Sequence, residues 1–326
     1  MRLAILGAGA WGTALAIAYA EEHGVTLWAR DAARREALRT TRRSRYLPDV
    51  ALHDAVEVVD DPLAAIRGAD VAHIATPTAG LRHAAGLVHH AAVWRPVVWV
   101  CKGFEQSSGK LPHQVVAEVL GATAPAAALS GPSFALEVAR GLPTAVTLAA
   151  DDADFARDLA RELHQRRLRL YFTDDLVGVE VGGAVKNIMA IATGISDGLG
   201  LGLNARAALI TRGLAELARL GVALGGRAET FMGLAGAGDL ILTCTGDLSR
   251  NRRVGLALGR GERLDAILAG LGHVAEGVHT AREVDAIARA RAIEMPITRE
   301  VCAVLFEGRA PSEAVAQLLA RDPKAE

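Results

Sequence analysis

The first twelve residues constrain the fold of this chain most. A five-residue apolar run, Arg2–Leu6, leads directly into Gly7-Ala8-Gly9-Ala10-Trp11-Gly12, and a segment of helical period, Thr13–Glu22, follows. In a strand–loop–helix setting, the first glycine of a GxGxxG pattern permits a tight turn. The second lets the backbone approach a pyrophosphate, and the third lets the helix sit close to the strand. The pattern therefore predicts a dinucleotide-binding loop; a glycine-rich turn without a ligand is the alternative.

Short apolar runs continue to alternate with helical segments up to about residue 172. Helical patterns such as Leu111–Leu120 separate several of these runs, which lack a polar face. Strands of that kind are buried on both sides, so the sequence predicts a doubly wound, mostly parallel sheet covered by helices, an α/β fold. The expected strands are Arg2–Leu6, Val25–Trp28, Val56–Val59, Val71–Ala75, Val97–Cys101, Ala126–Leu129, Thr144–Leu148 and Leu168–Phe172.

The pattern changes after Thr173-Asp174-Asp175. From there to Gln317 the chain is helical in pattern, with glycine-rich breaks at Gly198–Gly202, Gly225-Gly226 and Gly233–Gly238. A chain of 326 residues is also long for one hydrophobic core. We therefore predict a Rossmann-type dinucleotide-binding domain at 1–175 and an all-helical substrate domain at 176–326.

Composition excludes several classes of protein. Lys+Arg 36 against Asp+Glu 37 gives a net charge of -1, which is unlike a nucleic-acid binder. Three widely spaced cysteines and scattered histidines predict neither a disulfide framework nor a metal site. Too few residues precede Gly7 for a signal peptide, and the apolar stretch Val177–Ile195 carries Glu180 and Lys186. We expect a cytoplasmic protein that does not insert into a membrane.

The end of the second predicted strand bears on the choice of cofactor. NAD sites usually place a carboxylate there, whereas NADP sites place an arginine near the 2′-phosphate. Arg30 lies at the expected contact point and Asp31 follows it, where it can equally cap a helix Ala32–Arg39. The sequence favours NADP(H), with NAD(H) tolerated.

Lys186 interrupts an apolar helical segment. Its neighbours three and four residues away include no carboxylate, and Glu180 lies on a different face. Such a lysine must snorkel to solvent, find a partner elsewhere in the fold, or serve a ligand. Burial and a nearby cation favour the neutral amine, so Lys186 is a candidate general base, and Asn187 beside it makes one polar spot.

Three further segments carry candidate ligand groups. Lys102 follows an apolar strand, where it can meet a substrate and Lys186 or remain an exposed loop lysine. Ser133 follows another strand, and Pro132 suits a helix's first turn, so a plain capped helix is the alternative there. Ser249-Arg250-Asn251-Arg252-Arg253 presents donors at a predicted helix start, either as a phosphate cradle or as a solvated basic turn.

Seven motifs in order resemble those of the bacterial-type sn-glycerol-3-phosphate dehydrogenase family across nearly the whole chain. They read GAGAWGTA at Gly7–Ala14, CKG at Cys101–Gly103, SGPSF at Ser130–Phe134, GGAVKN at Gly182–Asn187, NARAALITRG at Asn204–Gly213, GDLILTCT at Gly238–Thr245 and SRNRR at Ser249–Arg253. One such motif would be weak evidence for the resemblance, but seven motifs in the same order are strong evidence. The family combines a Rossmann domain with a helical C-terminal domain, as predicted above.

The resemblance implies a role for each matching residue. Lys186 would be the general acid/base, and Lys102 would contact the substrate near the nicotinamide. The implied substrate-binding residues are Lys102, Gly131, Ser133, Lys186, Asp239, Ser249, Arg250 and Asn251; the implied cofactor-binding residues are Gly7, Gly9, Ala10, Trp11, Gly12, Arg30, Lys102, Ala135, Arg250, Val274 and Glu276. Family members vary where Ala10, Trp11 and Ser133 stand, and Ala10 offers a phosphate only its backbone.

The implied reaction interconverts sn-glycerol 3-phosphate and dihydroxyacetone phosphate, which supplies glycerol 3-phosphate for phospholipid synthesis. The apolar helical half also predicts a homodimer. Two alternatives remain from the residues alone: a related reductase of hydroxy acids, and a catalytically silent NADP sensor. Lys102, Lys186 and Asp239 together argue against the sensor, and the Ser249-Arg250-Asn251 group argues against the hydroxy acid.

Overall fold

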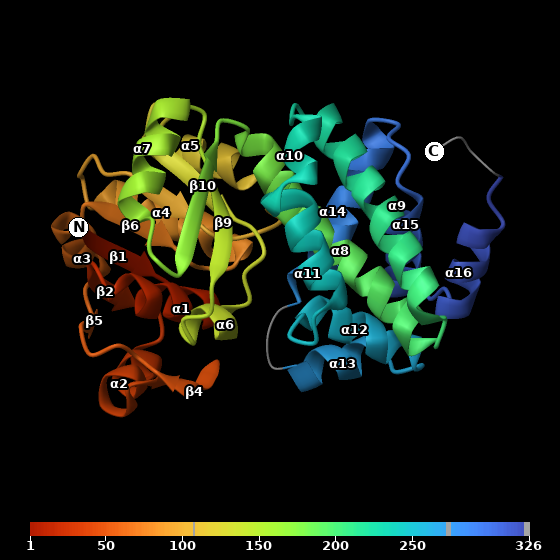
Figure 1. Ribbon diagram of the computed structural model, residues 1–326, viewed down its shortest axis with the longest axis horizontal. Coiled ribbons are helices and arrows are strands. Elements are labelled where there is room, and N and C mark those ends of the chain that lie inside the picture. The colour runs from red at the N-terminus through yellow and green to blue at the C-terminus, as the bar shows by residue number, and fades with distance from the viewer. Residues whose placement is uncertain (107, 272–274, 323–326) are drawn as a thin grey trace. The chain divides into compact units, whose positions relative to one another are not determined.

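The computed structural model describes residues 1–106, 108–271 and 275–322, and the chain divides into two compact units (Figure 1). The N-terminal unit holds Met1–Glu105 and Lys110–Glu180, and the C-terminal unit holds Gln106–Gly109 and Val181–Glu326. Helix α8, Leu176–Gly198, begins in the first unit and continues into the second.

An eight-stranded sheet forms the centre of the N-terminal unit, in the order β10-β9-β8-β7-β6-β1-β2-β5. Every pairing is parallel except that of β9 with β8. The strands are β1 Arg2–Leu6, β2 Gly24–Trp28, β5 Val56–Val58, β6 Val71–Ile74, β7 Val97–Trp99, β8 Ala126–Ser130, β9 Thr144–Ala149 and β10 Leu168–Thr173. All eight predicted strands are confirmed, and so is the mostly parallel sheet.

Helices pack along this sheet, and the central strands β6 and β7 are buried along their whole length. Leu3, Ile5 and Leu27 join Leu15 and Tyr19 of α1 in one apolar cluster, which explains the absence of a polar strand face. The helices of this unit, before α8, are α1 Ala10–Tyr19, α2 Ala32–Thr41, α3 Pro62–Gly68, α4 Leu81–His90, α5 Pro112–Leu120, α6 Ala135–Ala139 and α7 Ala153–Leu163, with a short 3₁₀ turn, η1, at Thr78–Gly80.

Two details of this unit differ from the prediction. Helix α1 begins at Ala10 rather than Thr13, because the Gly9 carbonyl already accepts the Thr13 amide at 3.0 Å. A two-stranded antiparallel ladder, β3 Arg43–Ser44 with β4 Leu47–Ala51, was not predicted. Its strands are short and mostly exposed, so they carry no apolar signal.

His73 lies at the centre of the sheet, on β6, with its ring 5.3 Å from the Tyr19 ring. Neither ring nitrogen has a partner among the residues that the structure describes, and burial followed by the charge of His23 lowers the pKa of His73 to about 3. The unfolded chain therefore binds the proton more readily than the folded chain. Stability is full above pH 6.5 and is lost as the pH falls toward 3.

We expect the free energy of unfolding to fall by roughly 2 kcal/mol from pH 6.5 to pH 4.5 through His73 alone. The variant His73→Leu should remove this loss, because leucine cannot take up a proton. Urea unfolding at both pH values measures it, with His83→Leu, at an exposed position of α4, as the control. An equal pH dependence in wild type and His73→Leu would contradict the prediction.

The described residues of the C-terminal unit form helices around the long apolar helix α8. By length and composition α8 is able to cross a membrane, but 94% of its apolar window is buried inside the protein, which accounts for its sequence. The other helices are α9 Gly202–Ala223, α10 Ala228–Met232, α11 Asp239–Thr245, α12 Arg250–Gly259, α13 Leu264–Leu271, α14 Glu276–Ala290, α15 Pro296–Phe306 and α16 Pro311–Leu319.

Helices α8 and α12 cross at backbone contact. A Cβ atom at Gly194 would collide with the Arg252 carbonyl, and one at Gly255 would collide with the Ile191 carbonyl. Gly198 and Gly259 repeat the arrangement one turn further on. The glycines therefore let the two helices approach more closely than side chains would allow.

The predicted glycine-rich break at Gly233–Gly238 is helical after Gly233. Residues Leu234–Gly238 form a π-helical turn, η2, in which the Gly238 amide donates to the Gly233 carbonyl at 3.1 Å. This turn leads directly into α11, whose first residue is Asp239. A π turn changes the register of the residues after it and is often found at functional sites.

Candidate active site

The glycine loop has the geometry of a phosphate-binding turn. Gly7 has a φ of +123°, and a Cβ atom at Gly7 would lie 2.5 Å from the Ala75 carbonyl oxygen. A Cβ atom at Gly12 would collide with the Gly7 carbonyl, whereas nothing lies within 4 Å of one at Gly9. Gly9 is the N-cap of α1, without a side-chain cap and without an acidic residue in the first turn. The amides that open α1, including those of Ala10 and Trp11, are therefore suited to an anion.

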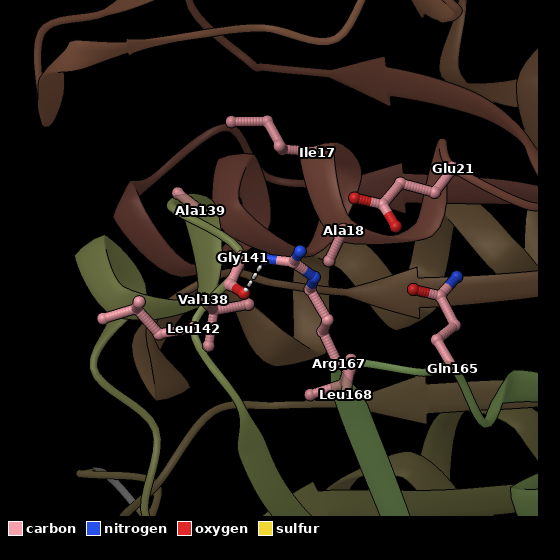
Figure 2. Close-up of a pocket in the computed structure, with 10 residues that line it drawn as sticks. All are labelled: Ile17, Ala18, Glu21, Val138, Ala139, Gly141, Leu142, Gln165, Arg167 and Leu168. Carbon is pink, nitrogen blue, oxygen red and sulfur yellow. Dashed lines mark hydrogen bonds between the residues drawn. The ribbon is translucent and has the colours of Figure 1, made fainter.

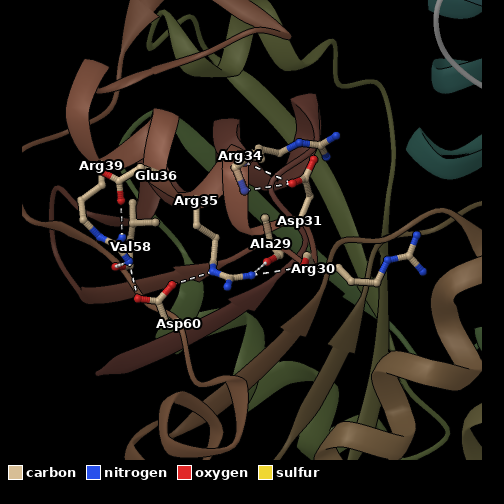
Figure 3. A network of polar contacts seen from close by, with 10 residues as sticks. Ala29, Arg30, Asp31, Arg34, Arg35, Glu36, Arg39, Val58 and Asp60 are labelled. Carbon is tan, nitrogen blue, oxygen red and sulfur yellow. Dashed lines mark hydrogen bonds and ion pairs between the residues drawn. The ribbon is translucent and has the colours of Figure 1, made fainter.

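Arg30 and Asp31 follow β2, as predicted (Figure 3). The Asp31 carboxylate caps α2 by accepting from the Ala33 amide at 3.0 Å and the Arg34 amide at 3.4 Å. Arg35 holds the backbone here, since its guanidinium donates to the Ala29 carbonyl at 2.7 Å and the Arg30 carbonyl at 3.1 Å. Among the described residues, the exposed Arg30 guanidinium has no partner, and Figure 3 shows it pointing away from this network.

Three predicted substrate residues of the N-terminal unit meet at one carbonyl. The Gly131 carbonyl accepts from Lys102 Nζ at 3.3 Å and from the Ser133 hydroxyl at 3.0 Å. Lys102 is half-buried, so the alternative of an exposed loop lysine is wrong. Helix α6 begins only at Ala135, with Phe134 as N-cap and no side-chain cap. Ser133 is therefore not a helix cap, and Pro132 does not lie in a first helical turn.

Lys186 is buried in the C-terminal unit, 7% exposed. Its ammonium donates to Asp239 Oδ1 and, at 3.0 Å, to the Thr243 hydroxyl. Thr243 in turn donates to the Asp239 backbone carbonyl at 2.6 Å. The snorkelling alternative is thus wrong, because the side chain ends on a carboxylate inside the protein.

The expectation of a Lys186 without an acidic neighbour needs correction. It holds along α8, but α11 supplies Asp239, and an adjacent carboxylate favours the charged ammonium over the neutral amine. Thr243 lies in the GDLILTCT motif, but its hydroxyl was not predicted as a partner of Lys186. It lies four residues after Asp239, and therefore on the same face of α11, so helical spacing alone was a usable signal.

A second buried cluster joins three helices beside Lys186. Asn251 Nδ2 donates to Asn187 Oδ1 at 2.8 Å, and Asn251 Oδ1 accepts from the Gly277 amide at 3.1 Å. Gly277 follows Glu276, the first residue of α14. Asn251 therefore links α8 and α12 to the residue after Glu276, and Val274 lies outside the described residues.

The predicted helix start at Ser249 is confirmed. The buried Ser249 hydroxyl caps α12 by accepting from the Arg252 amide at 3.2 Å. Arg252 is buried between Asp197, at 2.8 Å, and Asp247, at 2.9 Å, so for this residue the solvated-turn alternative is wrong. Arg250 is exposed in the first turn, and within the described part of the chain its guanidinium has no partner.

Comparison with known proteins gives a consistent result. Residues 2–156 match the N-terminal part, and residues 175–316 the C-terminal part, of NAD-dependent glycerol-3-phosphate dehydrogenase. The chain belongs to the NAD-dependent glycerol-3-phosphate dehydrogenase family.

Relatives cover the full length of this family member. A glycerol-3-phosphate dehydrogenase [NAD(P)+] of Dechloromonas aromatica is 61% identical over 100% of this chain and 99% of its own length. One of Aromatoleum aromaticum is 58% identical over 100% of both chains. The crystal structure of the Coxiella burnetii glycerol-3-phosphate dehydrogenase is 44% identical, with a TM-score of 0.93, and covers 98% of this chain and 99% of its own.

A more distant likeness bears on the hydroxy-acid alternative. The PanE/ApbA family ketopantoate reductase of Ralstonia eutropha has a TM-score of 0.59 at 17% identity, covering 97% of this chain and 100% of its own. At that identity the likeness shows a shared fold alone. The family matches above favour a glycerol-3-phosphate dehydrogenase instead.

One pocket in the N-terminal unit of this family member lies apart from the predicted site residues (Figure 2). It lies where α1, α6 and the start of β10 meet. Its walls come from Ile17, Ala18, Glu21, Val138, Ala139, Gly141, Leu142, Gln165, Arg167 and Leu168. None of the predicted site residues is among them.

Proposed function

We propose that the chain interconverts sn-glycerol 3-phosphate and dihydroxyacetone phosphate with a nicotinamide dinucleotide. The observation that carries the proposal is the buried Lys186–Asp239–Thr243 cluster of α8 and α11, together with the exposed Arg250 at the start of α12, which packs against α8. A charged proton donor and a guanidinium without a partner among the described residues are the groups that a phosphorylated ketone requires. In this proposal residues 1–175 bind the dinucleotide and residues 176–326 bind and convert the substrate.

The glycine loop fits the pyrophosphate of a dinucleotide. Open space at Gly9 leaves room for it, and the uncapped amides of Ala10 and Trp11 are donors for its oxygens. We propose Ala135, Val274, Glu276 and Lys102 as the residues around the nicotinamide half. When bound, the nicotinamide gives or accepts the hydride at C2 of the substrate.

Arg30 supports a preference for NADP(H), with NAD(H) tolerated. Its guanidinium is unpaired among the described residues, while Asp31 is engaged as a helix cap rather than held for a ribose. We expect Arg30→Asp to shift the ratio of kcat/KM for NADPH over NADH by at least about tenfold toward NADH, since a charge-assisted hydrogen bond is lost and repulsion is gained.

Steady-state kinetics with both cofactors measures this shift. Arg67→Asp is a matched control, because Arg67 is exposed on α3 in the same unit and far along the chain from β2. An unchanged ratio in Arg30→Asp would show that Arg30 does not reach the 2′-phosphate.

Lys186 is proposed as the general acid/base. In the reduction direction its ammonium donates a proton to the C2 oxygen, and Asp239 and Thr243 hold the amine in place and favour its reprotonation. In the oxidation direction the neutral amine accepts the hydroxyl proton. The carboxylate partner favours the charged form, so the resting cluster is prepared for reduction of the ketone.

The remaining groups of the proposed site bind and orient the substrate. Arg250 and Asn251, with the capped start of α12 at Ser249, are proposed to bind the phosphate, which supplies binding energy away from C2. Lys102, with Gly131 and Ser133, is proposed to contact the substrate from the end of β7.

We further propose that the protein is cytoplasmic and a homodimer, inserts into no membrane and binds no nucleic acid. Its product would supply phospholipid synthesis. The direct test of function is the oxidation of NADPH and NADH, followed by absorbance, with dihydroxyacetone phosphate. Turnover with the phosphorylated ketone, and little with a 2-keto acid, is the expected result. Absence of turnover with any phosphorylated ketone would contradict it and favour a silent NADP sensor.

A further inference from the structure

Glu180 is a buried carboxylate that the proposed reaction does not use. It lies in the first part of α8, within the N-terminal unit, and its side chain is only 2% exposed. Trp99 Nε1 donates to its Oε1 at 2.9 Å, and the backbone amide of His113 donates to the same oxygen at 2.8 Å. His113 Nδ1 lies 2.5 Å from the other oxygen, Oε2. Three elements of the unit, β7, α5 and α8, thus meet at one carboxylate.

The hydrogen bonds of Glu180 fix the relative orientation of the groups they join more than they raise the stability of the unit. Burial raises the pKa of the Glu180 carboxyl, and the bonds from His113 and Trp99 oppose this effect. Burying a charged pair costs about as much as the pairing returns, so apolar side chains of equal volume would stabilise the unit as well. What apolar side chains do not provide is a fixed direction, because hydrogen bonds hold only at defined distances and angles.

Each end of this cluster leads to a proposed site residue. Trp99 is the last residue of β7 and comes three residues before Lys102. Helix α8 runs on without interruption from Glu180 to Lys186, which is about 9 Å along the helix axis.

The helix between Glu180 and Lys186 contains an adjacent glycine pair. Gly182 and Gly183 are poor helix formers, and such pairs are common sites of helix bending. Gly182 is required here, because a Cβ atom would collide with the Ala235 carbonyl. A helix with this weak point needs an anchor close by if its direction is to be defined.

We propose that Glu180 is a positioning residue for the reaction: its carboxylate holds the first turns of α8 against Trp99 and His113, and so directs the helix that carries Lys186. Glu180 touches neither substrate nor cofactor in this proposal. It acts through Lys186, and therefore rests on the proposed role of that residue.

The test measures kcat and KM for dihydroxyacetone phosphate, the Kd of NADPH by fluorescence titration, and thermal unfolding, all on the full chain. Glu180→Ala should lower kcat about 10- to 100-fold, because a misplacement of about 1 Å can cost that much, and change the Kd of NADPH less than about twofold. Glu180→Gln should stay within about threefold of wild-type kcat, since its oxygen still accepts from Trp99 and its amide donates to a neutral His113 ring.

Asp152→Ala is the matched control for stability. The exposed Asp152 carboxylate caps α7 in the same unit by accepting from the Phe155 amide at 2.8 Å, and in the described structure it has no bond to Glu180, Trp99 or His113. It should lower the Tm without changing kcat. Wild-type kcat in Glu180→Ala, or a loss of kcat in both variants in proportion to Tm, would overturn the proposal, as would Glu180→Gln being as slow as Glu180→Ala.

Trp99→Phe covers the case in which Glu180→Ala does not fold. It removes one donor and leaves the two bonds from His113 in place, so kcat should fall about 3- to 10-fold. Unchanged kcat in Trp99→Phe would then overturn the proposal. A wild-type chain without any turnover would instead contradict the proposed function, so the two failures are distinguishable.

Discussion

Lys186→Ala should lower kcat by roughly 10²- to 10⁴-fold, the range that general acid–base groups contribute. The reason is that Asp239 and Thr243 hold the Lys186 ammonium, so the variant loses the proposed proton donor from this cluster. The Kd of NADPH should change less than about threefold, because the glycine loop and Arg30 belong to the N-terminal unit. Single-turnover reduction of dihydroxyacetone phosphate and fluorescence titration of NADPH measure the two quantities.

Stability is the main confounding effect in this experiment. Removing Lys186 leaves the Asp239 carboxylate buried without its cation, which costs about 3–5 kcal/mol in comparable pairs. The double variant Lys186→Met with Asp239→Asn removes both charges and should recover part of that loss while staying inactive. Near-wild-type kcat in a folded Lys186→Ala protein would refute the role of Lys186.

Arg250→Ala should lower kcat/KM for dihydroxyacetone phosphate by roughly 10- to 150-fold, the value of one charge-assisted hydrogen bond of about 1.5–3 kcal/mol. Most of the change should be in KM, because the guanidinium binds a phosphate that does not react. Steady-state kinetics with the ketone varied at saturating NADPH gives both constants.

Arg253→Ala is the matched control for Arg250. It removes an equally exposed arginine from the same helix, three residues further along. Dihydroxyacetone without its phosphate is a second control, since its slow reduction should be the same in wild type and Arg250→Ala. Equal losses in the two arginine variants would indicate a general charge effect rather than a phosphate contact.

The central strands of the sheet were predictable from sequence because they are buried on both faces and so form nearly continuous apolar runs, with His73 as an exception. Val71–Ile74 and Val97–Trp99 are buried throughout. The ladder of Arg43–Ser44 with Leu47–Ala51 was not predictable in this way, because short exposed strands resemble a loop in composition. Helix α1 began earlier than predicted because Gly9, a weak helix former, serves as its cap.

The sequence allowed the residues of the candidate site to be predicted, but not which of them form ion pairs and hydrogen bonds with one another. An apolar helix with one lysine indicated Lys186, yet its counter-ion lies 53 positions further along the chain, where no helical periodicity relates the two. The same limit applies to Arg252, which the sequence offered as part of a phosphate cradle or of a solvated basic turn, whereas the structure pairs it with Asp197. Local sequence patterns identify buried polar and charged side chains that require a partner. Which residue supplies the hydrogen bond or the opposite charge is decided by the tertiary structure.

The glycine contacts between α8 and α12 have a consequence for substrate choice. Lys186 and Asn187 belong to one of these helices and Arg250 and Asn251 to the other, and the two backbones touch without intervening side chains. Such a contact has no side-chain rotamers to adjust, so the two backbones fix the separation between the helix of the proposed proton donor and that of the proposed phosphate-binding residues. We therefore expect the protein to discriminate between phosphorylated ketones by the number of bonds between the carbonyl oxygen and the phosphate, because a longer or shorter ketone would reach only one of the two proposed groups.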